Sequence, residues 1–379
     1  MPTLQRVLMV AGEASGDLHG AGVVRAIRAR RPGAEIFGIG GDRMRGEGMD
    51  LTFHCADLSL MGFFEVVRNL PTVLRVERKL TALLEERRPD VVVLIDYPGF
   101  NLRFARKARR RRIPVLYYIS PQVWAWNPGR VTTMKAVVDR MKVVFPFEVD
   151  IYRNAGVDVE FVGHPLVEHI SATMTREAFF GRFGLDRGRK VLGILPGSRL
   201  QELERILPTL AGAAERLRAE ANVQPVLAVA PNLGVEAVRR FLPRETGITL
   251  VEHATYDLMQ HADAAVVTSG TATLETGWFG TPMVIVYRTS PASYMIGRML
   301  VDLPYIGLVN IVAGKKVVPE LLQSDMTVDR IVRAVRPYLE DQTKADAVRR
   351  ELAVIRSRLG APGASERVAE AVVALGEGT

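Results

Sequence analysis

Asp96 is the residue of this sequence that is best placed to act as a general base. It stands directly after the apolar run Val91–Ile95, in the string Ile-Asp-Tyr-Pro-Gly-Phe-Asn at 95–101. A carboxylate at the end of a buried strand would lie at the sheet edge where ligands bind, and there it could take a proton from a substrate hydroxyl. The position also suits an aspartate that only caps a helix or closes a turn. His19 is a second candidate base, although a single histidine on a helix more often has a structural role.

The turn after the first apolar run has the composition of a ligand-binding loop. It follows Arg6–Val10 and has the sequence Ala-Gly-Glu-Ala-Ser-Gly-Asp at 11–17. Gly12 and Gly16 would let the backbone approach a ligand closely, and the start of a helix favours an anion. Neither the G-x-G-x-x-G pattern nor the P-loop pattern is present, so NAD and ATP lose their usual support. A tight turn without a ligand is the alternative. The candidate binding residues are Glu13, Ser15 and Gly16.

Two turns in the second half of the chain are rich in groups that bind phosphate. The string Leu-Pro-Gly-Ser-Arg at 195–199 would bring backbone amides, a hydroxyl and a guanidinium together, which suits a phosphate or a diphosphate. In the string Thr-Ser-Gly-Thr-Ala-Thr-Leu-Glu at 268–275, the carboxylate of Glu275 could accept hydrogen bonds from a ribose diol. A capping box that ends at Glu275 is the alternative. Together the turns favour a nucleotide, with these candidate binding residues: Gly197, Ser198, Arg199, Ser269, Gly270, Thr271, Thr273 and Glu275.

The pattern of strands and helices accounts for the position of these turns. Short apolar, β-branched runs, each followed by a glycine or proline turn and a helical stretch, recur from Arg6–Val10 onward and start again at Val191–Leu195. Such alternation is typical of parallel sheets covered on both faces. We therefore expect an α/β fold with two Rossmann-like, doubly wound domains that face each other across a cleft. The expected ranges are an N-terminal domain at 1–166, a C-terminal domain at 167–350 and a helical tail at 351–379.

The charge balance favours an anionic partner. The 379 residues include 50 Lys and Arg against 42 Asp and Glu, a formal net charge of +8. Such a surface suits nucleic acid, a phosphorylated metabolite or an acidic membrane face. The densest basic stretch, Arg103–Arg112, is either a solvated helix face or a contact with such a partner. Cys55 is the single cysteine, which excludes a disulfide within the chain. We expect no metal and no other cofactor, because no metal-ligand motif is present.

The lengths of the apolar runs indicate where in the cell the protein is located. The first run, Val7–Val10, is too short for the core of a secretory signal. No uncharged apolar run approaches the ~20 residues that cross a bilayer. We therefore expect a cytoplasmic protein, which can still lie on a membrane surface.

Several strings along the chain resemble one known family. The sequence is similar to the lipid-A-disaccharide synthases, bacterial inverting glycosyltransferases with the two-domain GT-B fold. The turns at 11–17 and the string Ser-Pro-Gln-Val-Trp-Ala-Trp at 120–126 are together highly specific. The other strings that carry the resemblance are Gly38–Gly41, Met61–Val66, Ile95–Asn101, Phe161–Leu166, Leu195–Arg199 and Ser269–Glu275.

The resemblance implies a reaction and its participants. UDP-2,3-diacylglucosamine would donate its sugar to 2,3-diacylglucosamine 1-phosphate (lipid X), giving the β-1,6-linked lipid A disaccharide 1-phosphate and UDP. Asp96 would deprotonate the acceptor 6-hydroxyl, Arg199 would stabilise the departing diphosphate, and Asn310 would lie near the nucleotide. The resemblance further implies peripheral attachment to the inner membrane, a C-terminal helix that returns to the N-terminal domain, and room for a homodimer.

Two alternatives to this reaction stay open from the sequence. A different GT-B enzyme, such as a UDP-N-acetylglucosamine 2-epimerase, would share the nucleotide turns but would leave one sugar nucleotide as product. A basic nucleic-acid-binding protein would show steep salt dependence. The sequence ranks it last and we expect no nucleic-acid partner, because no cluster interleaves aromatic and basic residues.

Overall fold

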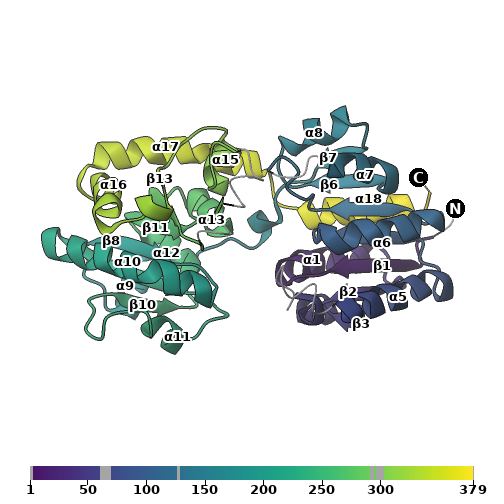
Figure 1. Cartoon of the computed structure of the whole chain (residues 1–379), viewed down its shortest axis with the longest axis horizontal. Helices are drawn as coiled ribbons and strands as arrows, with labels where there is room; N and C mark the ends of the chain where they lie inside the picture. The colour runs from purple at the N-terminus through teal and green to yellow at the C-terminus, as the bar shows by residue number, and fades with distance from the viewer. Residues whose placement is uncertain (1–2, 60–69, 126–128, 291–293, 296–302, 379) are drawn as a thin grey trace. The chain divides into compact units, whose positions relative to one another are not determined.

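The chain folds into two units, each built on its own parallel sheet (Figure 1). The computed structural model describes residues 3–59, 70–125, 129–290, 294–295 and 303–378. The string Met61–Val66 and the residue Trp126 lie outside them. Unit 1 comprises Met1–Glu168 and Leu359–Thr379, and unit 2 comprises His169–Arg358. Position 350, where the sequence suggested a boundary, lies within a helix, α17 (Gln342–Leu359).

Unit 1 contains a seven-stranded sheet in the order β3-β2-β1-β4-β5-β6-β7, with every strand pair parallel. The order reverses between β1 and β4, and the carboxyl ends of these two strands therefore flank a topological switch point. The strands are β1 (Arg6–Ala11), β2 (Glu35–Gly40), β3 (Asp50–His54), β4 (Val91–Ile95), β5 (Val115–Tyr118), β6 (Arg140–Val143) and β7 (Val159–Phe161).

Helices cover both faces of this sheet because its strands are apolar on both sides. Leu8 and Val10 of β1, with Val92 and Leu94 of β4, belong to one buried cluster with α5 (Leu70–Glu86), α6 (Pro98–Arg110) and α7 (Arg130–Val137). The opposite face is covered by α1 (Ala14–Arg30) and by α18 (Ala364–Gly376), which lie side by side (Figure 1). Among the described residues of unit 1, the remaining helices are α2 (Asp42–Gly46), α3 (Ala56–Ser59), α8 (Glu148–Asn154) and the 3-10 turn η1 (Pro165–Glu168).

The C-terminal helix is tied to unit 1 by polar contacts as well as by packing. Glu168 accepts hydrogen bonds from the backbone N–H and the hydroxyl of Ser365, at 2.8 and 2.6 Å. Glu377 accepts from the backbone N–H of Leu4 at 3.2 Å and forms an ion pair with Arg31 at 2.8 Å. The end of the chain is therefore part of the first sheet's cover.

Unit 2 repeats the same winding with six strands, in the order β10-β9-β8-β11-β12-β13. Here the switch point lies between β8 and β11. All pairs are again parallel, so the expected α/β class with two doubly wound sheets is confirmed. The strands are β8 (Lys190–Leu195), β9 (Val223–Val229), β10 (Thr249–Glu252), β11 (Ala264–Thr268), β12 (Met283–Tyr287) and β13 (Glu320–Leu322).

The second sheet is also covered on both faces. The long helix α10 (Leu200–Glu220) and α16 (Val328–Glu340) bury their apolar stripes in one cluster with β8, β9, β11 and β12. The other face carries α12 (Thr255–His261) and α13 (Thr271–Phe279), against which α17 packs at Gly277. The other helices in the part of unit 2 that the structure describes are α9 (Arg176–Phe183), α11 (Val235–Arg239), α15 (Leu308–Ala313) and the 3-10 turn η2 (Gln323–Asp325).

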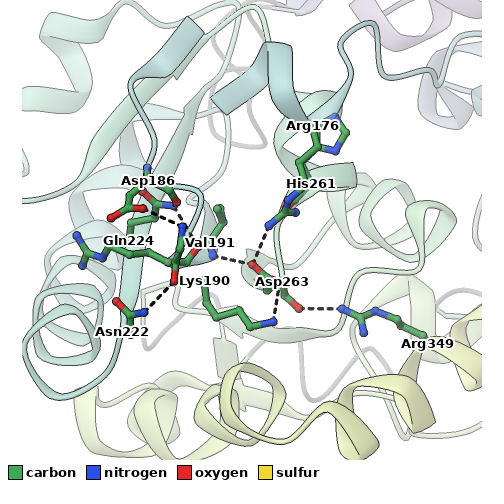
Figure 2. Close-up of polar contacts among 11 residues, drawn as sticks. Arg176, Asp186, Lys190, Val191, Asn222, Gln224, His261, Asp263 and Arg349 are labelled. Atoms are coloured by element: carbon green, nitrogen blue, oxygen red, sulfur yellow. Dashed lines mark hydrogen bonds and ion pairs between the residues drawn. The ribbon is translucent and has the colours of Figure 1, made fainter. Parts of the chain in front are cut away.

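Side chains close the amino-terminal edge of the second sheet (Figure 2). The carboxylate of Asp263, just before β11, accepts from the backbone N–H of Val191 at 2.8 Å and from the Lys190 ammonium at 3.2 Å. The side-chain amide of Gln224 on β9 accepts from the N–H of Asp186 at 2.9 Å and donates to its carbonyl at 2.7 Å. These bonds fix the strands of unit 2 at the edge opposite the turns that the sequence singled out.

Candidate functional site

The turn that carries Asp96 is an unusual piece of backbone. Asp96 and Tyr97 follow each other in the left-handed region, with φ of 45° and 48°, which non-glycine residues rarely adopt. Three hydrogen bonds from side chains hold the turn: the side-chain amide of Asn101 donates to the carbonyls of Ile95 and Asp96, at 3.2 and 2.7 Å, and the hydroxyl of Tyr117 donates to the carbonyl of Asp96 at 2.6 Å. The surrounding structure therefore imposes this strained conformation, as is common at functional sites.

The carboxyl group of Asp96 is prepared for proton transfer near neutral pH. Its pKa is raised from 3.8 to about 6, mainly because burial disfavours the charged form and also because the carboxylate of Glu13 lies nearby; the backbone N–H of Tyr97 opposes the shift. A general base works best when its pKa lies near the working pH. Asp96 thus has the place that the sequence suggested, after β4 at the switch point, together with the acidity that a base requires.

The glycines of the first turn accommodate the protein's own side chains. A Cβ on Gly12 would lie 2.3 Å from the ring of Tyr97, and one on Gly16 would lie 3.3 Å from the Cβ of Ala11. Gly12 therefore makes room for the residue next to Asp96, and Gly16 lets α1 pack closely on β1. Glu13 and Ser15 are exposed in the same turn, so their side chains are accessible to a ligand.

Asp17, in the same string, has a structural role that sequence reasoning did not assign. Its buried carboxylate accepts hydrogen bonds from the backbone N–H groups of Gly41, Met44 and Arg43, at 2.6, 3.0 and 3.2 Å. It thereby caps the start of α2 from a neighbouring helix, and a carboxylate at a helix N-terminus is favourable. The spacing between residues 17 and 41 gives no local signal for this contact.

His19 has a second histidine, His164, as a neighbour. The Nδ1 atom of His164 accepts from the backbone N–H of Leu166 at 3.1 Å, and its ring lies 5.1 Å from that of Phe145. Burial, together with His19, lowers the pKa of His164 to about 3. His164 therefore stays neutral, with its proton on Nε2. His19 is part-buried on α1, one helical turn beyond the Glu13–Ser15 turn.

Glu148 is a buried carboxylate that the sequence analysis missed. It accepts from the hydroxyl of Ser120 at 2.6 Å, from the indole N–H of Trp124 at 3.2 Å and from the backbone N–H of Phe145 at 3.1 Å. Burial raises its pKa to about 7, against the effect of these donors. Glu148 fixes the segment after β5 to the segment after β6, and the string at 120–124 thus has a buried anchor.

The carboxyl-terminal edge of the second sheet holds a cavity of about 690 Å³. It is large enough for a small-molecule ligand. Seven of the predicted binding residues line it: Gly197, Ser198, Arg199, Ser269, Gly270, Thr271 and Glu275. The two turns come from β8 and β11, the strands on either side of the switch point, so the topology brings them to one place.

The turn after β8 is shaped by a glycine and by Glu202. Gly197 has φ of 105°, and a Cβ there would lie 2.3 Å from the carboxylate of Glu202. That carboxylate accepts from the backbone N–H of Ser198 and from the Arg199 guanidinium, both at 3.2 Å. The side chain of Arg199 is otherwise 79% exposed. The loop therefore presents a hydroxyl and a guanidinium at the start of α10, while the amide of Ser198 is bonded to Glu202.

The turn after β11 divides its hydroxyl residues between two roles. Gly270, with φ of 148°, starts α13, and Thr271 lines the cavity. Thr273 is fully buried, and its hydroxyl donates to the carbonyl of Gly270 at 2.8 Å. We expected Thr273 to bind the ligand, but its side chain instead closes the turn. Glu275 lines the cavity one helical turn further on.

Asn310 was expected near the nucleotide, but its side chain is used inside the protein. It is fully buried, accepts from the N–H groups of Val317 and Val318 at 2.8 and 3.0 Å, and donates to Glu320 at 2.9 Å. Glu320 in turn accepts from the N–H of Ile306 at 3.0 Å, and the hydroxyl of Ser269 donates to the Ile306 carbonyl at 3.1 Å. Asn310 thus supports the Ser269 turn from a distance.

The described part of the chain contains neither a cluster of metal-ligating side chains nor a membrane-spanning helix. Across the described ranges, no three His, Cys, Asp or Glu side chains gather as a metal ion would need. Within the same ranges, no helix combines the length and apolar character required to cross a bilayer.

The basic stretch at 103–112 lies on α6 and the turn that follows it. Arg109 pairs with Asp139, Arg111 pairs with Glu85, and Lys107 pairs with Glu77 at 2.9 Å. Part of the positive charge is therefore neutralised at the surface of unit 1. Such pairs contribute little to stability.

Comparisons with known proteins identify the family. A family profile described as Lipid-A-disaccharide synthetase matches residues 7–372. The lipid-A-disaccharide synthase of Syntrophus aciditrophicus is 47% identical over 366 residues, which cover 96% of this chain and 96% of that protein. The enzyme of the same name from Geobacter sulfurreducens is 44% identical over 373 residues, which cover 98% of this chain and 97% of that protein.

Solved structures share the fold at much lower identity. UDP-GlcNAc 2-epimerase from Neisseria meningitidis, bound to UDP-GlcNAc, has a TM-score of 0.64 at 13% identity and covers 97% of this chain and 99% of its own. The glycotransferase of kitacinnamycin has a TM-score of 0.63 at 17% identity and covers 99% and 100%. These likenesses concern the GT-B fold alone and do not favour the epimerase alternative. Relatives named lipid-A-disaccharide synthase are identical to this chain at almost half of the aligned positions, along nearly its whole length. They confirm the resemblance seen in the sequence: this chain belongs to the family of lipid-A-disaccharide synthases.

Proposed function

We propose that this protein transfers 2,3-diacylglucosamine from its UDP derivative to the 6-hydroxyl of 2,3-diacylglucosamine 1-phosphate (lipid X). The products are the β-1,6-linked lipid A disaccharide 1-phosphate and UDP. Family membership gives the reaction class, a glycosyl transfer in lipid A synthesis. The identity of the two acylated substrates, the inversion at the sugar and the residue roles below are our assignment.

Asp96 is the base in this proposal. Its carboxylate takes the proton of the acceptor 6-hydroxyl while that oxygen forms a bond to the anomeric carbon of the donor sugar. The bond from this carbon to the diphosphate breaks on the opposite side, which inverts the configuration. The observation that carries the assignment is the position of Asp96 after β4, with a pKa of about 6. This value leaves the group ionised and still basic near neutral pH. His19 is the second candidate.

The cavity of unit 2 is the donor site in this proposal. The turn Gly197–Arg199 would hold the diphosphate, and Arg199 would stabilise the charge that develops as UDP leaves. Ser269, Gly270 and Thr271, at the start of α13, would contact phosphate oxygens, and Glu275 would bind the ribose. The support is that these residues line one cavity at the switch point of the sheet. Glu13, Ser15 and Gly16 are assigned to the acceptor side, in unit 1. The reaction needs neither a metal nor another cofactor in this scheme.

Acyl chains on both substrates place the reaction at a lipid surface. We therefore assign the protein to the cytoplasmic face of the inner membrane, as a peripheral protein. Supporting features are the exposed Leu74 of α5, 46% accessible, and the exposed arginines Arg103 and Arg109 of α6, 45% and 54% accessible, which also pair with Glu77 and Asp139. Basic groups near anionic lipid contribute roughly 1 kcal/mol each. A homodimer belongs to the same proposal, with the family resemblance as its support, and sedimentation velocity tests it.

The deciding experiment is product analysis with defined substrates. The purified protein is incubated with UDP-2,3-diacylglucosamine and 2,3-diacylglucosamine 1-phosphate, and products are identified by mass spectrometry. We expect a disaccharide 1-phosphate and one UDP for each disaccharide. Release of UDP with free monosaccharide, or a sugar nucleotide epimer without disaccharide, would refute the assignment. Arg239, exposed on α11 outside the donor cavity, supplies a control variant, Arg239→Ala, that should retain full activity.

A further inference from the structure

We infer that Tyr256 is a positioning residue for Glu275, which holds one carboxylate oxygen and leaves the other to a ribose hydroxyl. The inference rests on the proposed donor site and goes beyond it, because it concerns a residue that none of the motifs contains. The hydroxyl of Tyr256 donates to Oε1 of Glu275 at 3.0 Å, and both residues line the cavity of unit 2.

The two residues come from neighbouring helices at the same sheet edge. Tyr256 is the second residue of α12, after β10, and Glu275 is at the middle of α13, after β11. The ring of Tyr256 packs against Phe279, one turn beyond Glu275, with the centroids 6.0 Å apart. This packing fixes the hydroxyl over the carboxylate.

The carboxylate of Glu275 has a single hydrogen-bond donor within the described residues. That donor is Tyr256. The second oxygen, Oε2, therefore keeps its full capacity for a ligand, and a ribose diol supplies suitable donors. Hydrogen bonds to a charged group are stronger than neutral ones, so the ionised form of Glu275 is the form that recognises ribose best.

Charge at Glu275 depends on Tyr256. Burial raises the pKa of Glu275, and the Tyr256 hydroxyl lowers it. Burial raises the pKa of Tyr256 itself, so its hydroxyl remains a donor throughout the working pH range. Removing the donor would make Glu275 easier to protonate and would free its oxygens to rotate. The other titratable or charged side chains on the described cavity wall are Arg199, Glu202, His253 and Asp257.

Asp257 is already occupied elsewhere. Its carboxylate accepts from the N–H groups of Thr173 and Met174, at 2.8 and 2.6 Å. His253 is the histidine among these side chains. Its effect is common to all the variants below, and it cancels when each variant is compared with wild type at the same pH.

The test is UDP binding by calorimetry, which does not depend on transfer. Tyr256→Phe keeps the ring and its contact with Phe279 and removes only the hydroxyl. We expect UDP affinity to fall by about five- to tenfold, and by less as the pH is raised, because a higher pH favours the ionised carboxylate even without the donor. Affinity for 2′,3′-dideoxy-UDP should change little, because that probe lacks the hydroxyls. Tyr338→Phe, on α16 outside the cavity, should behave as wild type.

A double-mutant cycle shows whether Tyr256 acts through Glu275. In a Glu275→Gln background, Tyr256→Phe should have almost no further effect on UDP affinity. An equal loss in both backgrounds, or a loss that is the same for UDP and the dideoxy probe, would overturn the inference and leave the donor site in place. Absence of UDP binding by the wild-type protein would instead overturn the donor site itself.

Discussion

The carboxyl-terminal edges of the two sheets are built in opposite ways. In unit 1 the turn after β4 contains consecutive non-glycine residues in the left-handed region, Asp96 and Tyr97, which three hydrogen bonds hold in place. In unit 2 the turns after β8 and β11 have glycines at the special positions, Gly197 and Gly270, and open on a cavity. The strand order on either side of the switch point is the same in both sheets.

In the proposed mechanism, the difference matches what each edge would hold. A strained turn with a part-buried carboxylate presents a single side chain in one orientation, which suits a proton acceptor. Glycine turns at helix starts keep a Cβ out of the way of a ligand, which would suit a phosphate group. Under the proposed assignment, one winding would support two kinds of chemistry, and the turn residues would decide which.

The largest expected effect comes from removing the proposed base, Asp96. Asp96→Asn keeps the size and the turn but cannot take a proton. We expect the rate of disaccharide formation to fall by about 100- to 10,000-fold, with UDP affinity unchanged, because the nucleotide residues lie in unit 2. The measurements are steady-state kinetics and calorimetry with UDP. Turnover close to that of wild type would exclude Asp96 as the base and direct attention to His19.

A single added methyl group at Gly197 should distort the glycine turn after β8. Gly197→Ala places a Cβ 2.3 Å from the Glu202 carboxylate at φ of 105°, a strain of roughly 1–3 kcal/mol. We expect UDP affinity to fall by about tenfold, which calorimetry measures. Gly181→Ala, on α9 with nothing within 4 Å of the new Cβ, is the matched control. An affinity equal to wild type in Gly197→Ala would mean that this turn does not contact UDP.

The strained turn at Asp96 is tested by removing the side chain of Asn101, which holds it by hydrogen bonds. Asn101→Ala removes two hydrogen bonds to the carbonyls of Ile95 and Asp96, each contributing about 1 kcal/mol. We expect kcat to fall by about tenfold with KM nearly unchanged, because Asp96 would lose its fixed orientation. Asn222→Ala is the control, because it loses one hydrogen bond to the Gly188 carbonyl at the amino-terminal edge of the sheet in unit 2. It should keep wild-type kinetics. An equal effect of both variants would indicate a general loss of stability.

The ionised form of Asp96 should also lower the free energy of unfolding of the protein. The folded pKa of about 6 exceeds the ordinary 3.8. Its contribution to stability is therefore complete below about pH 4 and is lost as the pH rises through about 6. Asp96→Asn removes this loss, and we expect it to gain about 1–2 kcal/mol relative to wild type between about pH 4 and about pH 7.5. Urea unfolding at the two pH values measures this change; a difference independent of pH would contradict it.

The smallest expected effect concerns the helix that starts at the Asp96 turn. Replacing Arg109–Arg112 by Ser should lower the fraction bound to anionic vesicles by a few-fold, since basic groups near such lipid contribute roughly 1 kcal/mol each. The loss should be modest, because Arg109 and Arg111 already have carboxylate partners. Vesicle sedimentation with neutral vesicles as control measures it. An unaltered bound fraction would place the lipid contact elsewhere.

Much of the fold and of the site could be predicted along the chain. Apolar runs ending in glycine, proline or aspartate marked β1, β4, β8 and β11. In a parallel sheet all strand ends of one kind meet at one edge, so residues that directly follow a strand gather there without further information. Asp96 and the Gly197–Arg199 and Ser269–Glu275 turns were identified in this way, and the specific strings indicated the family.

Other properties depended on residues far apart in the sequence. Thr273 and Asn310 have the chemistry of binding residues, but their side chains bond the protein's own carbonyl and N–H groups. Spacing along the sequence likewise gives no signal for the anchor at Glu148 or for the pairing of Tyr256 with Glu275. Residue types and periodicity determined which strands form and which groups follow them. Burial and hydrogen bonding, which set the acidity of Asp96 and choose the partner of each polar group, arise only when distant segments pack together, so the tertiary structure alone decided them.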